Sequence, residues 1–302
     1  MILVIGGTGV VGAQVVDLLM SQKQQVRVLA GGYSDWHQQL TPQMRKAGVD
    51  VVNGDIRDQR VLAKAVSGCT GIVHTAGVIS DQPERSVDSV NHESVASLLP
   101  IAENAGVQRF VYVSCLGATQ FSSSEYLRSK WNAEMLVRQS NFLWTVFRPS
   151  LIFGEGSQLM RVLEFWVQRF PIVLCTGSGL NHLEPISVDD VAECVVQSLY
   201  NRDTVNQVYD LVGPETMNLS QLLELVTVGF TGQHKAQFKL PARAGYLLAD
   251  LLAKLNPRSP LSAEWMRLLN TELTADPALM RQHFKVPMLP LESQFKHLTA
   301  KS

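Results

Sequence analysis

Two side chains near the middle of the chain have the chemistry needed to move a proton. Tyr126 and Lys130 lie four residues apart in the stretch SCLGATQFSSSEYLRSK, residues 114–130. If that stretch is helical, both side chains point from one face toward a single ligand, because positions i and i+4 of a helix are neighbours. An ammonium group stabilises a phenolate, so the pattern predicts a tyrosine with a lowered pKa. Such a pair suits the protonation of a carbonyl oxygen while its carbon receives a hydride.

A glycine-rich loop near the start of the chain predicts a site for a dinucleotide. The stretch VIGGTGVVGAQVV, residues 4–16, places four glycines between a short apolar run and a segment with helical periodicity. Glycines permit a tight turn and let backbone N–H groups approach a pyrophosphate at the positive end of the helix. The loop residues that we assign to cofactor binding are Gly6, Thr8, Gly9, Val10, Val11 and Gly12.

The end of the second apolar run bears on the choice between NAD and NADP. A dinucleotide site usually has an acidic residue about 20 residues beyond the glycines, which binds the ribose 2′-hydroxyl. Here Ala30, Gly31 and Gly32 occupy that position, whereas Asp35 follows later and Arg27 lies inside the run. Without an acid at the strand tip, no like charge repels a 2′-phosphate. We therefore expect NADP as the cofactor, with NAD as the alternative.

Short apolar runs alternate with helical segments over the first half of the chain. The runs expected to form buried strands span residues 2–6, 25–30, 49–55, 71–77, 109–114 and 143–149, with a later one at 206–213. Helical segments between them include 12–22, 57–68 and 94–106. This βαβ rhythm predicts an α/β fold with a doubly wound, parallel sheet of the Rossmann type.

The βαβ rhythm loosens after residue 150, and the segments after residue 214 read as helices. We expect residues 1–150 to form a dinucleotide-binding domain to which residues 186–213 return. Residues 151–185 and 214–302 are expected to form a smaller, mostly helical lobe that binds the substrate or a partner. The helix expected at 242–255 has an apolar stripe with basic residues nearby, which suits a core face, an apolar substrate or a membrane surface.

The ordered motifs of the chain resemble those of the short-chain dehydrogenase/reductase superfamily. They are GGTGVVG at 6–12, the Asp-Ile pair at 55–56, HTAG at 74–77, RFVYVS at 109–114, YLRSK at 126–130, FRPSLIFGEG at 147–156 and PISVDDVAECV at 185–195. The set is similar to the extended or atypical branch, near the NmrA-like proteins and the nucleotide-binding accessory subunit of respiratory complex I. The resemblance covers residues 1–230 and implies a Rossmann domain that binds NAD(P).

The resemblance implies roles for further residues. Lys130 would bind the nicotinamide ribose, and Tyr126 would face the substrate. The other cofactor contacts that it implies are Asp55 and Ile56 at the adenine, Ala76 and Gly77 along the cofactor, and Pro149 beside the nicotinamide. The Asp pair at 189–190 is expected to cap a helix, since aspartate accepts hydrogen bonds from the free N–H groups at a helix start.

The chain departs from the family's pattern at Cys115. Active members have a serine or threonine there, which holds the substrate oxygen, and a thiol is a weaker hydrogen-bond donor than a hydroxyl. Ser114 lies one residue too early in the family's register to replace it. The candidate catalytic residues are therefore Tyr126, Lys130, Ser114 and Cys115. Turnover depends on whether the thiol of Cys115 can hold the substrate oxygen.

Composition narrows the remaining classes of function. The formal net charge is −1, so no global field attracts the chain to nucleic acid. The four cysteines lie far apart without a C-x-x-C spacing, which argues against a zinc site or disulfide framework, and we assign no metal. The sequence opens on MILVIGG, without a basic segment before it or an apolar run of about 18 residues, so we expect a cytoplasmic location.

Two functions of different classes are compatible with these features. The first is an NAD(P)-dependent oxidoreductase that reduces a carbonyl, quinone or related small-molecule acceptor, with Tyr126 as the proton donor. The second is an NAD(P)-binding scaffold, assembly factor or redox sensor, in which the smaller lobe binds a protein partner or a membrane surface. A nucleotide-sugar epimerase or dehydratase is the third. The intact Tyr126 and Lys130 favour the first function, and Cys115 favours the second.

Overall fold

The computed structural model describes residues 1–31, 35–82, 84–255, 262–293 and 295. Packing divides these residues into two compact units. The first unit takes its residues from 1–149, 189–211 and 277–286, and the second takes them from 150–188, 212–276 and 287–302.

A seven-stranded sheet forms the centre of the first unit. Its strand order is β11-β6-β5-β4-β1-β2-β3, and every neighbouring pair is parallel. The strands are β1 (Ile2–Ile5), β2 (Val26–Ala30), β3 (Asp50–Asn53), β4 (Gly71–His74), β5 (Arg109–Val113), β6 (Leu143–Pro149) and β11 (Gln207–Leu211). The chain order reverses between β1 and β4, which is the Rossmann arrangement, so the predicted fold is confirmed. Ligands of such sheets bind at the carboxyl ends of the strands beside that reversal.

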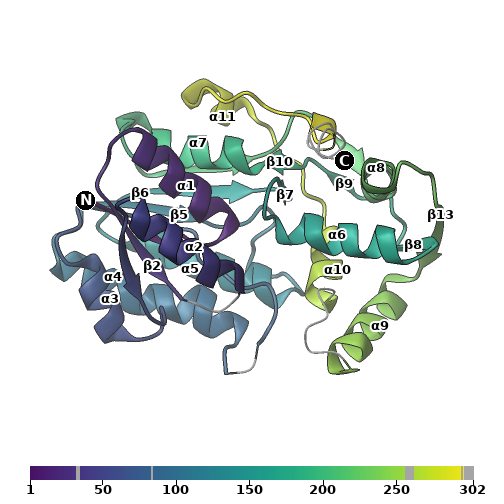
Figure 1. Cartoon of the computed structure of the whole chain (residues 1–302), viewed down its shortest axis with the longest axis horizontal. Helices are drawn as coiled ribbons and strands as arrows, with labels where there is room; N and C mark the ends of the chain where they lie inside the picture. The colour runs from purple at the N-terminus through teal and green to yellow at the C-terminus, as the bar shows by residue number, and fades with distance from the viewer. Residues whose placement is uncertain (32–34, 83, 256–261, 294, 296–302) are drawn as a thin grey trace. The chain divides into compact units, whose positions relative to one another are not determined.

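Helices cover both faces of this sheet (Figure 1). They are α1 (Val10–Ser21), α2 (Asp35–Lys46), α3 (Gln59–Val66), α4 (Ser94–Asn104), α5 (Glu125–Gln139) and α7 (Val188–Ser198), with a π-helical turn η1 (Ser89–Glu93) and a 3-10 turn η2 (Arg202–Thr204). Right-handed crossovers place α3, α4 and α5 on one face and α1 and α2 on the other. The apolar faces of α3, α4 and α5 form one core with the strands, to which Leu62, Leu98 and Val137 belong.

A short helix late in the chain, α11 (Ala278–His283), also belongs to the first unit. The ring of Phe284 lies 5.5 Å from that of Phe147 and 4.9 Å from that of Tyr209, centroid to centroid. The hydroxyl of Tyr209 is 2.5 Å from Nδ1 of His283. From the sequence this segment was expected in the smaller lobe, because six helical residues carry no signal of which core they join. Aromatic packing against β6 and β11 decides it.

The second unit contains four helices and three small sheets among its described residues. The helices are α6 (Gln158–Arg169), α8 (Leu219–Thr231), α9 (Ala242–Leu255) and α10 (Ala263–Leu269). The sheets pair β7 (Ile152–Phe153) with β10 (Ile186–Ser187), β9 (His182–Leu183) with β12 (Met217–Asn218), and β8 (Ile172–Thr176) with β13 (Ala236–Leu240).

The strand β13 was not expected, since everything after residue 214 read as helical. The segment AQFKL alternates, however, so that Gln237 bonds to Ser220 of α8 while Phe238 points to the other face of the strand. Five residues of parallel pairing with β8 then fix the strand.

The part of the chain that the structure describes has no disulfide, no cluster of metal ligands and no helix able to span a membrane. All four cysteines are free and buried. No three histidine, cysteine, aspartate or glutamate side chains among these residues are grouped to hold a metal ion. None of the helices in the described ranges combines the length and the apolar character that crossing a membrane requires.

Candidate functional site

The glycine loop between β1 and α1 is shaped by contacts that no larger residue allows. Gly6 has a φ of +81°, and a Cβ there would lie 2.6 Å from the backbone nitrogen of Ala76. A Cβ on Gly12 would lie 2.1 Å from the carbonyl oxygen of Gly6. The same oxygen accepts a hydrogen bond from the Gly9 nitrogen at 2.8 Å. The loop is therefore a tight backbone cradle against the first turn of α1.

This cradle fits the pyrophosphate of a dinucleotide. Gly9 is the N-cap residue of α1 and has no side chain, so no capping side chain occupies the positive end of the helix. The loop also lies beside the end of β4, since Thr75 donates hydrogen bonds from Oγ1 to the carbonyls of Ile5 and Gly6, at 3.0 and 3.2 Å. The assigned loop residues thus sit at the carboxyl ends of β1 and β4, at the reversal of strand order.

Adding a methyl group at Gly12 should disrupt this cradle. We expect Gly12→Ala to lower the affinity for NADPH by roughly tenfold or more and to cost about 2 kcal/mol of stability, because the backbone oxygen of Gly6 must move. Gly71→Ala, at the amino end of β4 and away from the loop, is the control, since its Cβ would lie 3.0 Å from Cδ1 of Ile2, the end of a side chain that can move. Titration of the intrinsic NADPH fluorescence measures the affinity. Unchanged affinity in Gly12→Ala would show that the loop does not hold the dinucleotide.

Lys130 is fixed at the carboxyl ends of β4 and β5. Its Nζ donates hydrogen bonds to the carbonyl of Val113 at 3.0 Å and to that of Ala76 at 3.4 Å, and lies 5.2 Å from the ring centroid of Tyr112. The side chain is 4% exposed. Burial lowers the pKa of Lys130 to about 8. A Cβ at Gly77 would be 3.0 Å from this ammonium, so Gly77 keeps the space beside it open.

Asn91 completes this polar region, although no sequence motif singled it out. It lies in the π-helical turn η1 and is fully buried. Its Oδ1 accepts from the Val78 nitrogen at 2.8 Å, and its Nδ2 donates to the Val78 carbonyl at 2.9 Å and to Oγ of Ser129 at 3.0 Å. The asparagine therefore ties the segment after β4 to α5 next to Lys130. Its local signal is the widened helical turn, which often marks a functional site.

Tyr126 and Cys115 are hydrogen-bonded to each other. Helix α5 begins where Oγ of Ser124 accepts from the Leu127 nitrogen at 3.2 Å, and this cap places Tyr126 in the first turn. The Tyr126 hydroxyl donates to Sγ of Cys115. Sγ of Cys115 is in turn 3.3 Å from the carbonyl of Leu116, to which its S–H donates. The thiol of Cys115 thus accepts the hydrogen bond of Tyr126, the proposed proton donor.

The expected lowering of the tyrosine pKa was wrong. Burial, with the thiol of Cys115 and then Tyr112 adding to it, raises the pKa of Tyr126 well above its usual value. Burial likewise raises the pKa of Cys115 to about 11, although Lys130 opposes the shift. Both groups therefore keep their protons at neutral pH. The tyrosine is arranged as a proton donor rather than as a phenolate.

Three buried polar side chains near Lys130 have no hydrogen-bond partner among the described residues. They are Ser114 through Oγ, Tyr112 through its hydroxyl and His74 through both ring nitrogens. Burial, with the charge of Lys130 adding to it, lowers the pKa of His74 to about 3, so the imidazole is neutral. Its ring packs 5.5 Å from that of Tyr112. His74 therefore lies in this region with both ring nitrogens unpaired, and Ser114 keeps a hydroxyl available beside the thiol.

Arg148 forms an ion pair with a fully buried carboxylate of α5. Its Nε and Nη2 lie 2.9 and 2.6 Å from the two oxygens of Glu134, and its guanidinium lies 5.6 Å from the ring of Trp131. A bidentate contact of this kind fixes α5 against β6. This pairing holds in place the helix that carries Tyr126 and Lys130.

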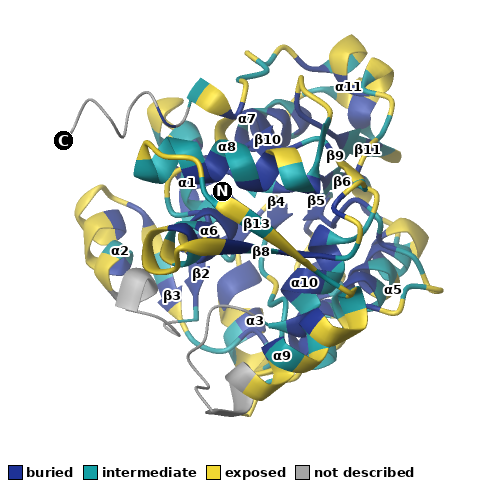
Figure 2. Cartoon of the chain, turned by 90° about the vertical axis from the view of Figure 1, so that its right-hand side faces the viewer, coloured by how far each residue is buried: buried dark blue, intermediate teal, exposed yellow. Residues whose placement is uncertain are grey.

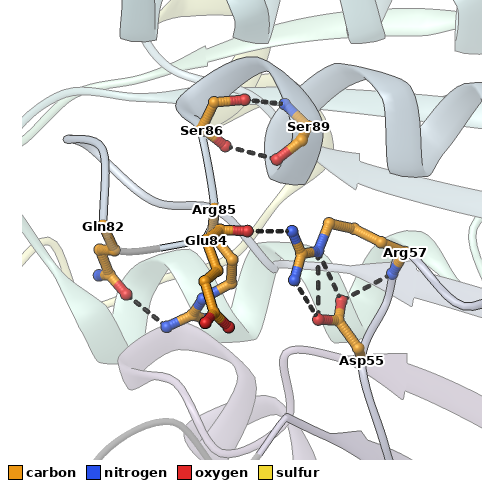
Figure 3. A network of polar contacts seen from close by, with 7 residues as sticks. All are labelled: Asp55, Arg57, Gln82, Glu84, Arg85, Ser86 and Ser89. Carbon is orange, nitrogen blue, oxygen red and sulfur yellow. Dashed lines mark hydrogen bonds and ion pairs between the residues drawn. The ribbon is translucent and has the colours of Figure 1, made fainter.

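The adenine end of the expected site contains an unforeseen arginine. Arg57 makes a bidentate contact with Asp55, at 2.6 Å between Nη2 and Oδ2, and its Nη1 donates to the carbonyl of Glu84 at 2.5 Å. Figure 3 shows this guanidinium between the carboxylate of Asp55 and the segment from Glu84 to Ser89. Ile56 is buried in the core. The role of Asp55 and Ile56 at the adenine stays a prediction, and Arg57 joins them.

Two other positions bear on the cofactor. Pro149 ends β6, is buried, and accepts a hydrogen bond from the Leu116 nitrogen at 2.9 Å, which brings it close to Cys115. Arg27 does not serve a 2′-phosphate, because its Nε contacts Asp50 at 2.7 Å and its Nη1 donates to Ser67, at the amino ends of the strands. Gly32 lies outside the described residues.

Comparison with known proteins identifies relatives of the chain. The model of a protein family described as NAD(P)H-binding matches residues 6–202. NADH dehydrogenase (ubiquinone) 1 alpha subcomplex subunit 9 from Arabidopsis thaliana is 27% identical over 74% of this chain and 56% of its own length. The chain thus spans little more than half of that relative. An NAD(P)H azoreductase from Xenophilus azovorans is 26% identical over 72% of this chain and 70% of its own.

A solved structure gives the same result for the fold. The NADPH-dependent quinone oxidoreductase from Escherichia coli, complexed with NADPH, has a TM-score of 0.76 to this chain. The two share 18% identity, and the match covers 99% of this chain and 100% of that one. At this identity the likeness establishes a shared fold.

Proposed function

The chain belongs to the NAD(P)H-binding family, and from that membership we propose that it is an NAD(P)-dependent oxidoreductase that reduces a carbonyl, quinone or related small-molecule acceptor. The observation that carries the proposal is the position of Lys130 on α5. Its ammonium is fixed beside Gly77 at the ends of β4 and β5, one helical turn from Tyr126. The relatives whose names describe reductases of small acceptors support it.

In this proposal the residues of the chain position the reactants and supply the proton. The bound nicotinamide supplies the hydride. The glycine loop holds the pyrophosphate, and Lys130 donates its remaining N–H to the nicotinamide ribose. Tyr126 turns its hydroxyl from Cys115 to the acceptor oxygen and donates its proton there as negative charge develops. A raised pKa keeps this proton on Tyr126 until that charge appears.

Cofactor preference follows from the strand tip. Ala30 ends β2, and Gly31 follows it, so the described tip carries no carboxylate to repel a 2′-phosphate. We propose NADPH as the preferred reductant.

A second candidate function is an NAD(P)-binding scaffold without turnover. The observation that favours it is the hydrogen bond from Tyr126 to Cys115, because a thiol in this place is a weaker donor to a substrate oxygen than a hydroxyl. The name of the plant relative, a subunit of a larger complex, is consistent with it. A nucleotide-sugar epimerase or dehydratase has no comparable support from the site residues.

Cofactor oxidation separates the two candidates. We expect the chain to oxidise NADPH in the presence of a soluble quinone or an aldehyde, followed as the loss of nicotinamide absorbance. Cys115→Ser should raise turnover about fivefold, since a hydrogen bond stronger by about 1 kcal/mol then holds the acceptor oxygen. Cys69→Ser, at another buried cysteine of the first unit, is the matched control and should change nothing.

The contrary outcomes are distinct. Tight NADPH binding with no turnover in either the native chain or Cys115→Ser would reject the oxidoreductase and leave the scaffold. Failure to bind either dinucleotide at micromolar concentration would reject both.

A further inference from the structure

Six large apolar side chains of the second unit are exposed in a few adjoining elements. They belong to α6, the turn after it, β8, β13 and α9, and we call their surface the α6–β13–α9 face. The side chains and their exposed fractions are Phe165 (47%), Phe170 (39%), Ile172 (46%), Phe238 (55%), Leu247 (71%) and Leu251 (55%). Isolated exposed apolar residues are ordinary, but an accumulation of aromatic and branched side chains in one region indicates a contact surface.

The sheet of β8 and β13 leaves one of its faces uncovered. Ile172 pairs with Ala236 and Leu174 pairs with Phe238, so these four side chains share one face. The other face packs on α8, where Gln237 exchanges hydrogen bonds with Ser220. Figure 2 shows exposed residues along β13 and at the start of β8. Within the second unit no described element covers the face that carries Ile172 and Phe238, since both remain about half exposed.

The aromatic residues at the end of α6 adjoin this sheet face. Phe170 is the C-cap residue of α6 and directly precedes the segment of β8. Its ring stacks on that of Trp166, with centroids 4.6 Å apart, and its carbonyl accepts a hydrogen bond from Nζ of Lys235 at 2.9 Å. Lys235 directly precedes β13, so a cation is held at the rim of the exposed rings.

Helix α9 adds an apolar stripe that its own packing leaves exposed. Tyr246 and Ala249 face α10, where they contact Ala263 and Met266. Leu247 and Leu251 are four residues apart and therefore lie together on another side of the helix. The first turn of α9 is anchored to β8, since a Cβ at Gly245 would lie 2.5 Å from Cγ2 of Thr176.

The charge of this region differs in sign from that of the whole chain. Residues 158–176 and 234–251 contain five basic residues, Arg161, Arg169, Lys235, Lys239 and Arg243, against two acidic ones, Glu164 and Asp250. Their net charge is therefore 5 − 2 = +3, whereas the 302-residue chain carries −1. Exposed aromatic and leucine side chains with a basic rim fit the boundary of an anionic lipid bilayer, where the rings enter the headgroups and the cations contact phosphate.

We propose that the α6–β13–α9 face docks on an anionic membrane surface. The chain then lies on the bilayer without crossing it, in agreement with the lack of a spanning helix among the described residues. The proposal is independent of the reaction at the first unit, because all six apolar residues and all five basic ones belong to the second unit.

Co-sedimentation of the full chain with lipid vesicles tests the proposal. We expect binding to vesicles of phosphatidylcholine with phosphatidylglycerol and little binding to phosphatidylcholine alone. Phe238→Ser should lower the vesicle affinity about tenfold, since a buried phenyl ring is lost. Phe121→Ser is the matched control, because Phe121 is 86% exposed and lies in the first unit. A circular dichroism melt checks that both variants fold.

A charge reversal gives an independent arm. Arg243→Glu should lower binding to the anionic vesicles by more than about fivefold, because Arg243 is exposed one helical turn before Leu247 on α9, whereas Lys46→Glu, on α2 of the first unit, should leave it unchanged. Absence of binding to anionic vesicles would overturn the proposal. Self-association that Phe238→Ser abolishes, without vesicle binding, would assign the face to a second copy of the chain and equally overturn it.

Discussion

Replacing Tyr126 with phenylalanine is expected to lower NADPH-dependent turnover by a factor of about 100 or more while leaving NADPH affinity unchanged. The loss has this size because positioned general acids typically contribute about 10²- to 10⁴-fold to a rate. Affinity should persist because none of the cofactor contacts expected of the chain comes from the hydroxyl of Tyr126. Stopped-flow loss of nicotinamide absorbance with the best quinone or aldehyde measures the rate, and fluorescence titration measures the affinity.

Tyr200→Phe is the matched control for this change, since Tyr200 is 54% exposed and lies in the turn after α7. It should behave as the native chain does. A Tyr126→Phe variant that reduces the acceptor at the native rate would remove the tyrosine from the proposed mechanism, and the proton would then come from another group or from water.

Replacing Lys130 with methionine is expected to abolish turnover and, at neutral pH, to stabilise the fold. The pKa of Lys130 falls from an ordinary value of 10.5 to about 8 because the ammonium is buried, which corresponds to a cost of about 3 kcal/mol. The two hydrogen bonds to Val113 and Ala76 that the variant loses are each worth about 1 kcal/mol. We therefore expect a net gain of about 1 kcal/mol in the free energy of unfolding.

The pH dependence of that gain follows from the lowered pKa. Below about pH 8 the lysine is charged in both the folded and the unfolded chain, so the whole cost of burial is present. Between pH 8 and 10.5 the unfolded chain holds a proton that the folded chain has released, so the native protein becomes more stable relative to the variant as pH rises. The advantage of Lys130→Met, about 1 kcal/mol, should therefore vanish within about one pH unit above pH 8, and above the window the native chain should be the more stable by about 2 kcal/mol.

Urea unfolding across this pH window measures the effect, with Lys64→Met as the control at an exposed lysine of α3. A variant that is less stable than the native chain below pH 8 would mean that Lys130 serves the fold rather than the cofactor. A variant that is more stable would support a functional role for Lys130, because a buried charge that weakens the fold is expected where function requires it.

The sequence was sufficient to predict the central sheet and the loop that begins the site. The strands are short apolar runs buried on both faces, and their period is visible locally in segments such as that of β5. The loop is set by steric limits at Gly6 and Gly12, which act within one turn of chain. Both the strands and the loop depend on residues that are close in sequence, so the local sequence pattern predicts them.

The chemistry of the site depends on groups that only packing brings together. Ser129 meets Asn91 across 38 residues, and Lys130 meets Val113 across 17. The spacing of Tyr126 and Lys130 predicted a cation that lowers the pKa of the phenol. In the structure that cation bonds to backbone carbonyls, and the phenol bonds to Cys115 instead. The spacing placed both residues on one helix, but it did not give the groups that their polar atoms contact.

The return of α11 to the first unit affects the order in which the protein is made. Phe284 and His283 supply part of the aromatic packing around Phe147 and Tyr209, yet they leave the ribosome more than 70 residues after β11. The nucleotide-binding half therefore cannot complete its core during synthesis of its own strands. Its core is complete only when nearly the whole polypeptide has been made. A nascent chain stopped at residue 276 would expose the rings of Phe147 and Tyr209 to chaperones.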